Sequence, residues 1–248
     1  MDENHYGDWL IVIPARLAST RLPEKPLQDL RGKPLIVRVA ENLQPLSRKG
    51  AQVLVACDDP KILSVCKKNN ITAVITDKSH ESGTDRCHEA SLTQNRKYIL
   101  NVQGDEPFIS TDDLELLMSS FSKQKDSNSI ATLVHVSHDQ NDFNNPNVCK
   151  TVLDASGNAL YFSRAPIPHS RDDKGSTPFY QHVGVYGFTA GSLKKFCQFS
   201  TGKLEKIEKL EQLRALENGM TIETYPCQSI PLGIDTEDDM ERARAKFN

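Results

Sequence analysis

The sequence lacks the features that would direct it into a membrane or along a secretion route. None of its apolar runs approaches the ~20 residues that a membrane-spanning helix needs. The N-terminal stretch, MDENHYGDW, is acidic and polar, whereas a secretory signal begins with basic residues and continues with an apolar segment. We therefore expect a cytoplasmic protein without a membrane span.

Metal-binding cysteine pairs and a basic excess are also missing. The six cysteines are dispersed without any Cys-x-x-Cys pair, which disfavours a structural zinc site and predicts reduced thiols. The 30 Lys and Arg residues nearly balance the 33 Asp and Glu residues, giving a net charge of −3. A broad nucleic-acid surface needs a clear positive excess, so we expect no nucleic-acid partner.

What the first half does contain is an alternation of strand-like and helix-like segments. Continuous apolar runs suit strands that are buried on both faces, and helical spacing or capping patterns lie between them. This order predicts an α/β fold, a mainly parallel twisted sheet flanked by helices. The expected strands are 9–14, 52–57, 71–76 and 98–103, and the expected helices are 34–46, 58–70, 83–94 and 110–121.

The second half has more consecutive strand-like runs, and DASGN (154–158) predicts a hairpin turn. We read 9–248 as one domain, with 130–190 as a smaller antiparallel subdomain, 1–8 as an N-terminal extension and 168–178 as its most mobile loop. The expected strands are 130–137, 149–154, 159–164, 180–189 and 220–226. The expected helices are an amphipathic one at 204–219 and a terminal one at 235–247.

The common phosphate-binding motifs GxxxxGK[ST] and GxGxxG are absent. Instead, ARLASTRLPEKP (15–26), here called the basic loop, carries Arg16, Arg21 and Lys25 directly after the first strand. Ligands of open parallel sheets bind at the carboxyl ends of strands. These cations therefore favour a polyphosphate ligand, and backbone N–H groups around 18–20 suit an anion nest. The alternative is a solvated loop whose cations pair with surface acids.

Two carboxylates are candidates for a metal site. Asp105, in NVQGDEP, follows the fourth strand, and Asp235, in GIDTEDD, precedes the last helix. Mg²⁺ takes one or two protein carboxylates together with phosphate oxygens and water. A pair of carboxylates facing a triphosphate would explain both residues, whereas two ordinary helix caps would explain each separately.

Three further motifs point to ligand contacts less sharply. SGTDR (82–86) places small residues at a loop-to-helix junction, where exposed backbone can contact a phosphate or a base edge. Arg164 ends a strand, and His182 and Tyr186 share one face of an alternating strand. That polar face suits a hydroxylated ligand. The alternative for SGTDR is a simple capping turn with a surface arginine. As isolated signals, Arg164, the His182–Tyr186 face and the Glu211–Gln212 pair are more often structural.

Taken together and in order, seven blocks closely resemble the CMP-Kdo synthetases, the 3-deoxy-manno-octulosonate cytidylyltransferase family, over about residues 9–247. The blocks are IPARLASTRLPEKP, SGTDR, NVQGDEP, ALYFSRAPIP, QHVGVYGF, EKLEQLRALENG and GIDTEDD. The resemblance implies a Rossmann-like fold of the nucleotide-diphospho-sugar transferase type, with an antiparallel insertion for dimerisation and sugar binding. It implies that CTP and Kdo, an eight-carbon keto-sugar acid, give CMP-Kdo and diphosphate with Mg²⁺. It also implies a cytoplasmic homodimer serving lipopolysaccharide assembly.

Carried over residue by residue, the resemblance implies three groups of site residues. The CTP contacts are Pro14, Ala15, Arg16, Arg21, Lys25, Ser82, Gly83, Thr84, Arg86 and Gln103. The sugar pocket is formed by Arg164, His182, Tyr186, Glu211 and Gln212. Asp105 and Asp235 are the implied metal ligands, and with Arg16 and Lys25 they make up the implied catalytic set.

Glu24 departs from the family pattern, in which we expect a glycine, as in RLPGKP. Glycine permits positive φ or a phosphate close to the backbone, whereas a carboxylate would repel a triphosphate. We therefore expect ordinary φ at Glu24 and a side chain in solvent. The alternative is a salt bridge that holds Arg21 or Lys25 until CTP arrives.

Three readings of the function stay open beside Kdo activation. One is the same chemistry on the 8-amino-8-deoxy analogue of Kdo, and another is a nucleotidyltransferase for a sialic acid. The third is a non-catalytic nucleotide-binding module. Asp105 and Asp235 argue against the last reading, because a binding module needs no paired metal carboxylates.

Overall fold

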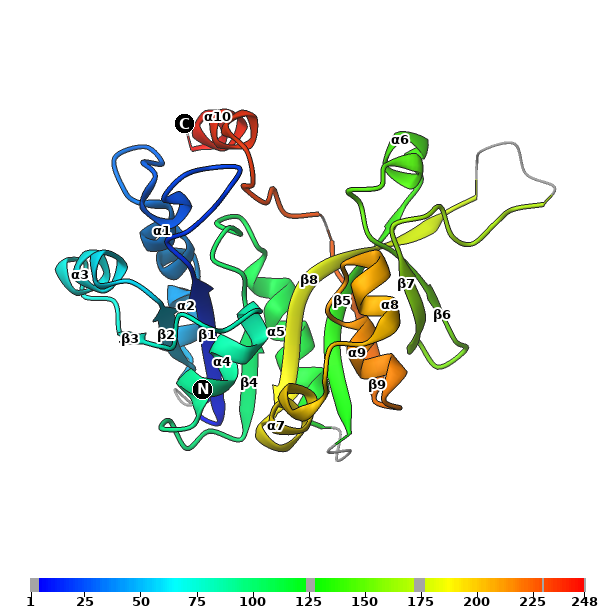
Figure 1. Cartoon of the computed structure of the whole chain (residues 1–248), viewed down its shortest axis with the longest axis horizontal. Coiled ribbons are helices and arrows are strands. Elements are labelled where there is room, and N and C mark those ends of the chain that lie inside the picture. The colour runs from blue at the N-terminus through cyan, green and yellow to red at the C-terminus, as the bar shows by residue number, and fades with distance from the viewer. Residues whose placement is uncertain (1–4, 124–127, 172–176, 229, 248) are drawn as a thin grey trace. The chain divides into compact units, whose positions relative to one another are not determined.

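The structure is a computed structural model that describes residues 5–123, 128–171, 177–228 and 230–247. The chain divides into two compact units, residues 1–115 with 231–248, and residues 116–230 (Figure 1). The expected N-terminal extension and the expected mobile loop at 168–178 lie partly outside the described residues. The single domain over 9–248 stays a prediction.

Four parallel strands form the centre of the first unit, in the order β3-β2-β1-β4. They are β1 (Trp9–Ala15), β2 (Gln52–Cys57), β3 (Ala73–Ile75) and β4 (Tyr98–Asn101). Every residue of β1 is buried, as expected for a strand covered on both faces. The chain builds β2 and β3 on one side of β1 and then crosses to place β4 on the other. Such a reversal leaves a crevice at the carboxyl ends of β1 and β4.

Helices connect the strands of this unit and include the last helix of the chain. They are α1 (Leu35–Asn42), α2 (Gln44–Arg48), α3 (Pro60–Lys68), α4 (Gly83–Ser91) and α10 (Glu237–Lys246), with the short 3₁₀ helix η1 (Lys25–Leu27). In Figure 1, α10 lies at the same end of the unit as the loops after β1, and Arg31 Nε donates to the Arg244 carbonyl at 2.9 Å. The single helix expected at 34–46 is wrong, because Pro45 cannot continue α1 and instead occupies the first turn of α2.

The second unit is centred on β5 (Ser129–Ser137), which pairs antiparallel with β8 (Phe179–Thr189) and parallel with β9 (Thr221–Pro226). β6 (Lys150–Leu153) and β7 (Ala159–Ser163) form an antiparallel hairpin, and Gly157 at φ 85° supplies its turn. The predicted α/β class, with a mostly parallel sheet and an antiparallel part, is confirmed. The remaining helices are α5 (Thr111–Phe121), α6 (Gln140–Asn144), α7 (Ala190–Gln198), α8 (Lys203–Glu208) and α9 (Leu213–Glu217).

The amphipathic helix expected at 204–219 is wrong, since α8 and α9 are separate. The break occurs at Lys209, which has φ 54°. Arg214 donates to Glu205 at 2.9 and 2.6 Å in a buried ion pair. A straight helix would separate these residues by about 13.5 Å along its axis. The break lets the buried pair form and leaves Ile207 78% exposed.

No helix in the described part of the chain combines the length and the apolar character needed to cross a bilayer.

Candidate active site

A cleft of about 230 Å³ lies where β1 and β4 end, at the crevice of the first unit. Most of the predicted nucleotide-binding residues line it, but Arg21, Ser82 and Thr84 do not. Pro26 lines the cleft without having been predicted. The lining residues are Pro14, Ala15, Arg16, Ala18, Ser19, Lys25, Pro26, Gly83, Arg86, Gln103, Gly104 and Asp105.

The start of the basic loop is tied to two neighbouring segments. The Leu17 N–H donates to Asp58 Oδ1 at 2.9 Å, directly after β2. The Arg16 guanidinium donates to the carbonyl of His80, ahead of α4. Sequence reasoning missed Asp58 and His80, and their position after a strand or before a helix was the only signal. These contacts hold the loop over the cleft.

Gly104 lets the turn after β4 approach the end of β1. A Cβ at this position would lie 2.7 Å from the Pro14 carbonyl oxygen, which belongs to the backbone. A side chain cannot be accommodated there without displacing one of the two strand ends. Gly104 therefore determines how close Asp105 lies to the basic loop.

We expect Gly104→Ala to lower the free energy of unfolding by about 1–3 kcal/mol, because overpacking forces the backbone apart. Activity should fall by more than the loss of folded protein, since Asp105 moves with the turn. Gly191→Ala is the matched control, because its Cβ would meet only Thr189 Oγ1 at 3.8 Å. Urea unfolding and initial rates measure both effects, and equal results for the two variants would contradict the close-approach role.

A chain of buried amide contacts positions Gln103. Gln103 Nε2 donates to Asn101 Oδ1 at 2.9 Å, and Asn101 Nδ2 donates to Thr84 Oγ1 at 3.1 Å. Ser82 caps α4 by accepting from the Asp85 N–H at 3.1 Å. Ser82 and Thr84 thus support the cleft, and the fully buried Asn101 is a support that the sequence reading missed.

Arg86 is fully buried, although it was predicted from an apparently exposed junction. Its Nη1 donates to Thr76 Oγ1, and its Nη2 lies 3.8 Å from Asp58 Oδ2. Burial lowers the pKa of the guanidinium. Within the described residues, Nε and Nη2 have no hydrogen-bond acceptor. Since buried donors are nearly always paired, these two atoms suit a ligand that supplies acceptors to the cleft.

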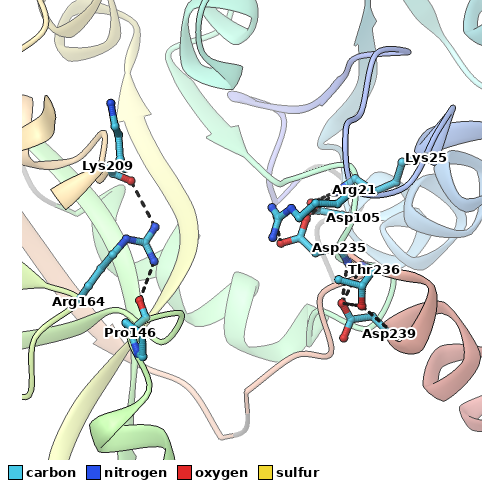
Figure 2. Close-up of polar contacts among 9 residues, drawn as sticks. All are labelled: Arg21, Lys25, Asp105, Pro146, Arg164, Lys209, Asp235, Thr236 and Asp239. Atoms are coloured by element: carbon cyan, nitrogen blue, oxygen red, sulfur yellow. Dashed lines mark hydrogen bonds and ion pairs between the residues drawn. The ribbon is translucent and has the colours of Figure 1, made fainter. Parts of the chain in front are cut away.

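Lys25 joins the two predicted metal carboxylates. Its ammonium lies 2.6 Å from Asp105 Oδ2 and 3.0 Å from Asp235 Oδ1, and Arg21 Nη2 lies 3.0 Å from Asp235 Oδ2 (Figure 2). Burial alone would lower the pKa of Lys25, but the charges and hydrogen bonds of both carboxylates outweigh it and raise the pKa. Asp105 and Asp235, which lie 80 and 210 positions after Lys25 in the sequence, thus meet at one cation.

Asp235 is held by the start of α10. Asp239 Oδ2 accepts from the N–H groups of Asp235 and Thr236 at 3.1 and 2.9 Å (Figure 2). The Ile234 N–H also donates to the Asp105 carbonyl at 2.9 Å. The expected helix therefore begins later than predicted, at Glu237. Asp235 precedes its N-cap, which leaves the side chain available to Lys25 and Arg21.

Glu106 lies beside this pair without adding a full negative charge near neutral pH. Burial raises its pKa to about 8, and the charges of Asp105 and Asp235 act in the same direction. A Cβ at residue 233 would lie 3.0 Å from Glu106 Oε1, so Gly233 leaves room for this carboxyl group. Among the described residues, no cluster of three or more His, Cys, Asp or Glu side chains is arranged to hold a metal.

The ordinary φ expected at Glu24 is wrong. The residue has φ 49° and ψ 35°, a left-handed conformation that costs about 1–2 kcal/mol for a residue with a Cβ. Its carbonyl accepts from the Leu27 N–H at 2.8 Å, so the tight turn into η1 imposes this conformation. The half-exposed carboxylate lies 2.6 Å from Lys61 Nζ on α3. The salt bridge thus joins the basic loop to α3 through Lys61, a partner other than the expected Arg21 or Lys25.

In the second unit, three of the predicted sugar-pocket residues lie together. Tyr186 donates its hydroxyl hydrogen to Gln212 Oε1 at 3.0 Å, and its ring lies 5.6 Å from that of His182, centroid to centroid. Burial raises the pKa of Tyr186, and the charge of Glu211 acts in the same direction. The expected shared face of His182 and Tyr186 is confirmed, although a register shift interrupts β8 between them.

Arg164, another of the predicted sugar residues, is bound to backbone carbonyls. Its Nε donates to Glu208 O at 2.8 Å, and its Nη groups donate to Pro146 O at 3.0 Å and Lys209 O at 3.4 Å (Figure 2). A guanidinium has five N–H donors, so donors remain for a ligand. Glu208, which the sequence reading missed, accepts from the Ser163 hydroxyl at 2.6 Å and the Arg164 N–H at 2.9 Å.

The burial of His182 predicts a pH dependence of stability. Burial lowers its pKa to about 3, whereas an unfolded histidine titrates near 6.5. Between these values the unfolded chain binds the extra proton, so stability should fall as pH falls below about 6.5, by up to ~1.4 kcal/mol per pH unit. His182→Gln should flatten this slope in urea unfolding measured from pH 6.5 to 4. An unchanged slope would contradict the burial of a neutral imidazole.

Comparison with known proteins identifies the family. The cytidylyltransferase family profile matches residues 10–222. The chain is 43% identical to a 3-deoxy-manno-octulosonate cytidylyltransferase of Neisseria meningitidis serogroup C, covering 97% of this chain and 98% of that protein. The chain belongs to the 3-deoxy-manno-octulosonate cytidylyltransferase family. A second cytidylyltransferase of this kind, from an Acidovorax species, is 41% identical over 94% of this chain and 95% of its own length.

Solved structures agree with this cytidylyltransferase assignment. CMP:2-keto-3-deoxy-manno-octonic acid synthetase complexed with CTP has a TM-score of 0.90 and 36% identity, covering 96% of this chain and 98% of that one. HddC from Yersinia pseudotuberculosis has a TM-score of 0.68 at 16% identity, covering 96% and 99%. The latter likeness concerns the fold alone. The resemblance read from the seven sequence blocks is thus confirmed.

Proposed function

We propose that this protein transfers the cytidylyl group of CTP to 3-deoxy-manno-octulosonate, forming CMP-Kdo and diphosphate for lipopolysaccharide assembly. The observation that carries the proposal is the cation and carboxylate cluster at the carboxyl ends of β1 and β4, in a chain about 42% identical to such enzymes over nearly its full length. Arg16 and Lys25 line the cleft that receives the nucleotide, and Arg21 lies beside it.

The chemistry asks mainly for positioning and charge neutralisation. The anomeric hydroxyl oxygen of Kdo bonds to the α-phosphorus as the bond to the diphosphate oxygen breaks, and the hydroxyl proton is released. Charge on the phosphate oxygens is spread in such a transfer, so cations fixed around them lower the barrier. Lys25 and Arg21 neutralise the triphosphate, while Arg86 and Gln103 contact the cytidine side from within the cleft.

Asp105 and Asp235 fit a magnesium site. One ammonium lies within 3.0 Å of both carboxylates, an arrangement that supports a cation site shared by the pair. Hard oxygen donors of this kind suit Mg²⁺, with phosphate oxygens and water completing its shell. When bound, Mg²⁺ supplies charge stabilisation to the phosphate oxygens. Asp105 and Asp235 hold it, and Asp239 keeps the Asp235 backbone in place.

The sugar acid binds to residues of the second unit. His182, Tyr186, Glu211 and Gln212 contact its hydroxyl groups, and the remaining donors of Arg164 contact its carboxylate. His182 Nε2 lies 2.9 Å from Thr132 Oγ1, so the imidazole is fixed on the strand rather than free to rotate.

We further propose that the protein is a cytoplasmic homodimer that pairs through the second unit. Val136 and Tyr180, opposite each other on β5 and β8, are 48% and 38% exposed and suit a buried subunit contact.

A substrate panel tests the function. Diphosphate release is measured with CTP and Mg²⁺ in the presence of Kdo, 8-amino-8-deoxy-Kdo or a sialic acid. Turnover with Kdo at the highest kcat/KM supports the proposal, whereas a preference for another acid would transfer the assignment to it. CTP binding without turnover for any of the acids would indicate a binding module. Light scattering after size-exclusion chromatography measures the dimer separately.

A further inference from the structure

Two of the three cations of the basic loop, Lys25 and Arg21, compete with the proposed metal for the same oxygen atoms. Lys25 lies on Asp105 Oδ2 at 2.6 Å and on Asp235 Oδ1 at 3.0 Å. Arg21 lies on Asp235 Oδ2 at 3.0 Å. Three of the four carboxylate oxygens of the pair therefore already contact a positive charge (Figure 2). A divalent ion needs these atoms as ligands.

The competition is strongest at the contact between Lys25 and Asp105, because that contact is partly shielded from water. The Lys25 side chain is 17% exposed and that of Asp105 is 29% exposed, so solvent and salt screen their attraction less than at an open surface. A cation that stays on these carboxylates repels a second one, since like charges a few ångströms apart interact by kilocalories at the effective dielectric of a protein surface. Metal binding therefore requires Lys25 and Arg21 to leave the carboxylates and to pair with another anion.

The nucleotide supplies that other partner. Lys25 lines the cleft, and Arg21 lies in the same loop with its side chain 67% exposed, so both can turn to an anion placed there. A triphosphate offers more negative charge than the two carboxylates, and charge-assisted contacts to phosphate are of similar or greater strength.

We propose that Lys25 and Arg21 are exchangeable counter-ions of the Asp105–Asp235 pair, which move to the triphosphate when CTP binds and thereby release the carboxylates to the metal. This inference rests on the proposed binding of CTP and Mg²⁺. It means that metal alone binds weakly, and that nucleotide and metal each strengthen the binding of the other. Such coupling is reciprocal by thermodynamic necessity.

The first test measures metal affinity without nucleotide. Mn²⁺ is titrated into the full chain, and free Mn²⁺ is followed by electron paramagnetic resonance. Lys25→Met should bind Mn²⁺ about tenfold more tightly than wild type, because the metal then has no charge-assisted lysine contact to displace. Lys78→Met is the matched control, because Lys78 pairs with Asp59 at 3.9 Å instead, and it should change the affinity less than twofold. Equal tightening by Lys78→Met would overturn the contact mechanism in favour of overall charge.

The second test is reciprocal and does not depend on the Lys25 variant folding. CTP is titrated by calorimetry in the presence of EDTA. Asp235→Asn removes the carboxylate shared by both cations and should tighten metal-free CTP binding about tenfold. Asp238→Asn, an exposed residue of α10, should not. If both variants tighten binding equally, counter-ion exchange is wrong.

The outcomes also separate this inference from the proposed function. If Asp105→Asn leaves Mn²⁺ affinity unchanged in the Lys25→Met background, the proposed metal site itself fails. If Asp105→Asn abolishes Mn²⁺ binding but Lys25→Met does not strengthen it, the metal site stands and only the exchange is overturned.

Discussion

Replacing Asp105 by Asn is expected to lower kcat/KM for CMP-Kdo formation by on the order of 10²- to 10³-fold, the loss typical when one fixed electrostatic group is removed from a transferring centre. The change keeps the shape of the side chain but removes the charge that faces Lys25 at 2.6 Å. It therefore weakens the proposed Mg²⁺ site and leaves Lys25 with one carboxylate instead of two.

The measurement is initial diphosphate release with CTP and Kdo over a range of Mg²⁺ concentrations. Because the variant loses metal affinity, part of its activity should return at high Mg²⁺. Asp112→Asn, an exposed residue in the first turn of α5, is the control and should stay within about twofold of wild type. Full activity of Asp105→Asn at limiting Mg²⁺ would remove Asp105 from the catalytic set.

The second large effect is expected at Lys150, which sequence reasoning did not single out. Lys150 is fully buried, and its ammonium donates to the carbonyls of Asn145 at 2.9 Å, Val148 at 2.7 Å and Arg164. Burial lowers its pKa. Lys150→Met would leave these carbonyls without their shared donor. We expect the free energy of unfolding to fall by about 3 kcal/mol or more, since each buried unsatisfied group costs ~1–3 kcal/mol.

A functional readout distinguishes Lys150 from an ordinary buried residue. One of its carbonyl partners belongs to Arg164, which we propose contacts the sugar carboxylate, so the KM for Kdo should rise more than the KM for CTP. Lys195→Met provides the control: Lys195 is exposed and its ammonium contacts Asn128 Oδ1 at 2.5 Å. It should change stability by less than about 0.5 kcal/mol. A Lys150→Met variant as stable as this control would show that the three contacts contribute nothing.

Local patterns predicted β1 and β2 well because their residues are mostly apolar, whereas β3 and β4 are shorter than the expected 71–76 and 98–103. β1 and β2 begin and end within one residue of the expected 9–14 and 52–57. The helices expected at 34–46 and 204–219 were wrong, because in each case the apolar spacing continues past a feature that interrupts the helix. In the first case this is Pro45, which is visible in the sequence. In the second it is the Arg214–Glu205 ion pair, which depends on the chain folding back.

The candidate site likewise contains residues that the sequence predicted and residues that only the structure revealed. The sequence blocks predicted Arg16, Lys25, Asp105 and Asp235 as site residues, because these residues lie in short segments that can be compared directly with the family pattern. The structure added Asp58, Asn101, Asp239 and Glu208, which hold those segments in place. Asn101, Asp239 and Glu208 lie inside the sequence blocks, but the sequence does not show which group each of the four residues contacts.

Glu24 illustrates the difference between what the sequence determined and what only the tertiary structure decided. By itself, the sequence determined the α/β class and the family and predicted the candidate site residues, since these follow from apolar periodicity and from short motifs. Only the tertiary structure decided that Glu24 is left-handed and paired with Lys61, and that Lys25 joins Asp105 to Asp235. The physical reason is that a turn's φ and an ion pair's partner depend on which distant segments the sheet order brings to the same end of β1 and β4.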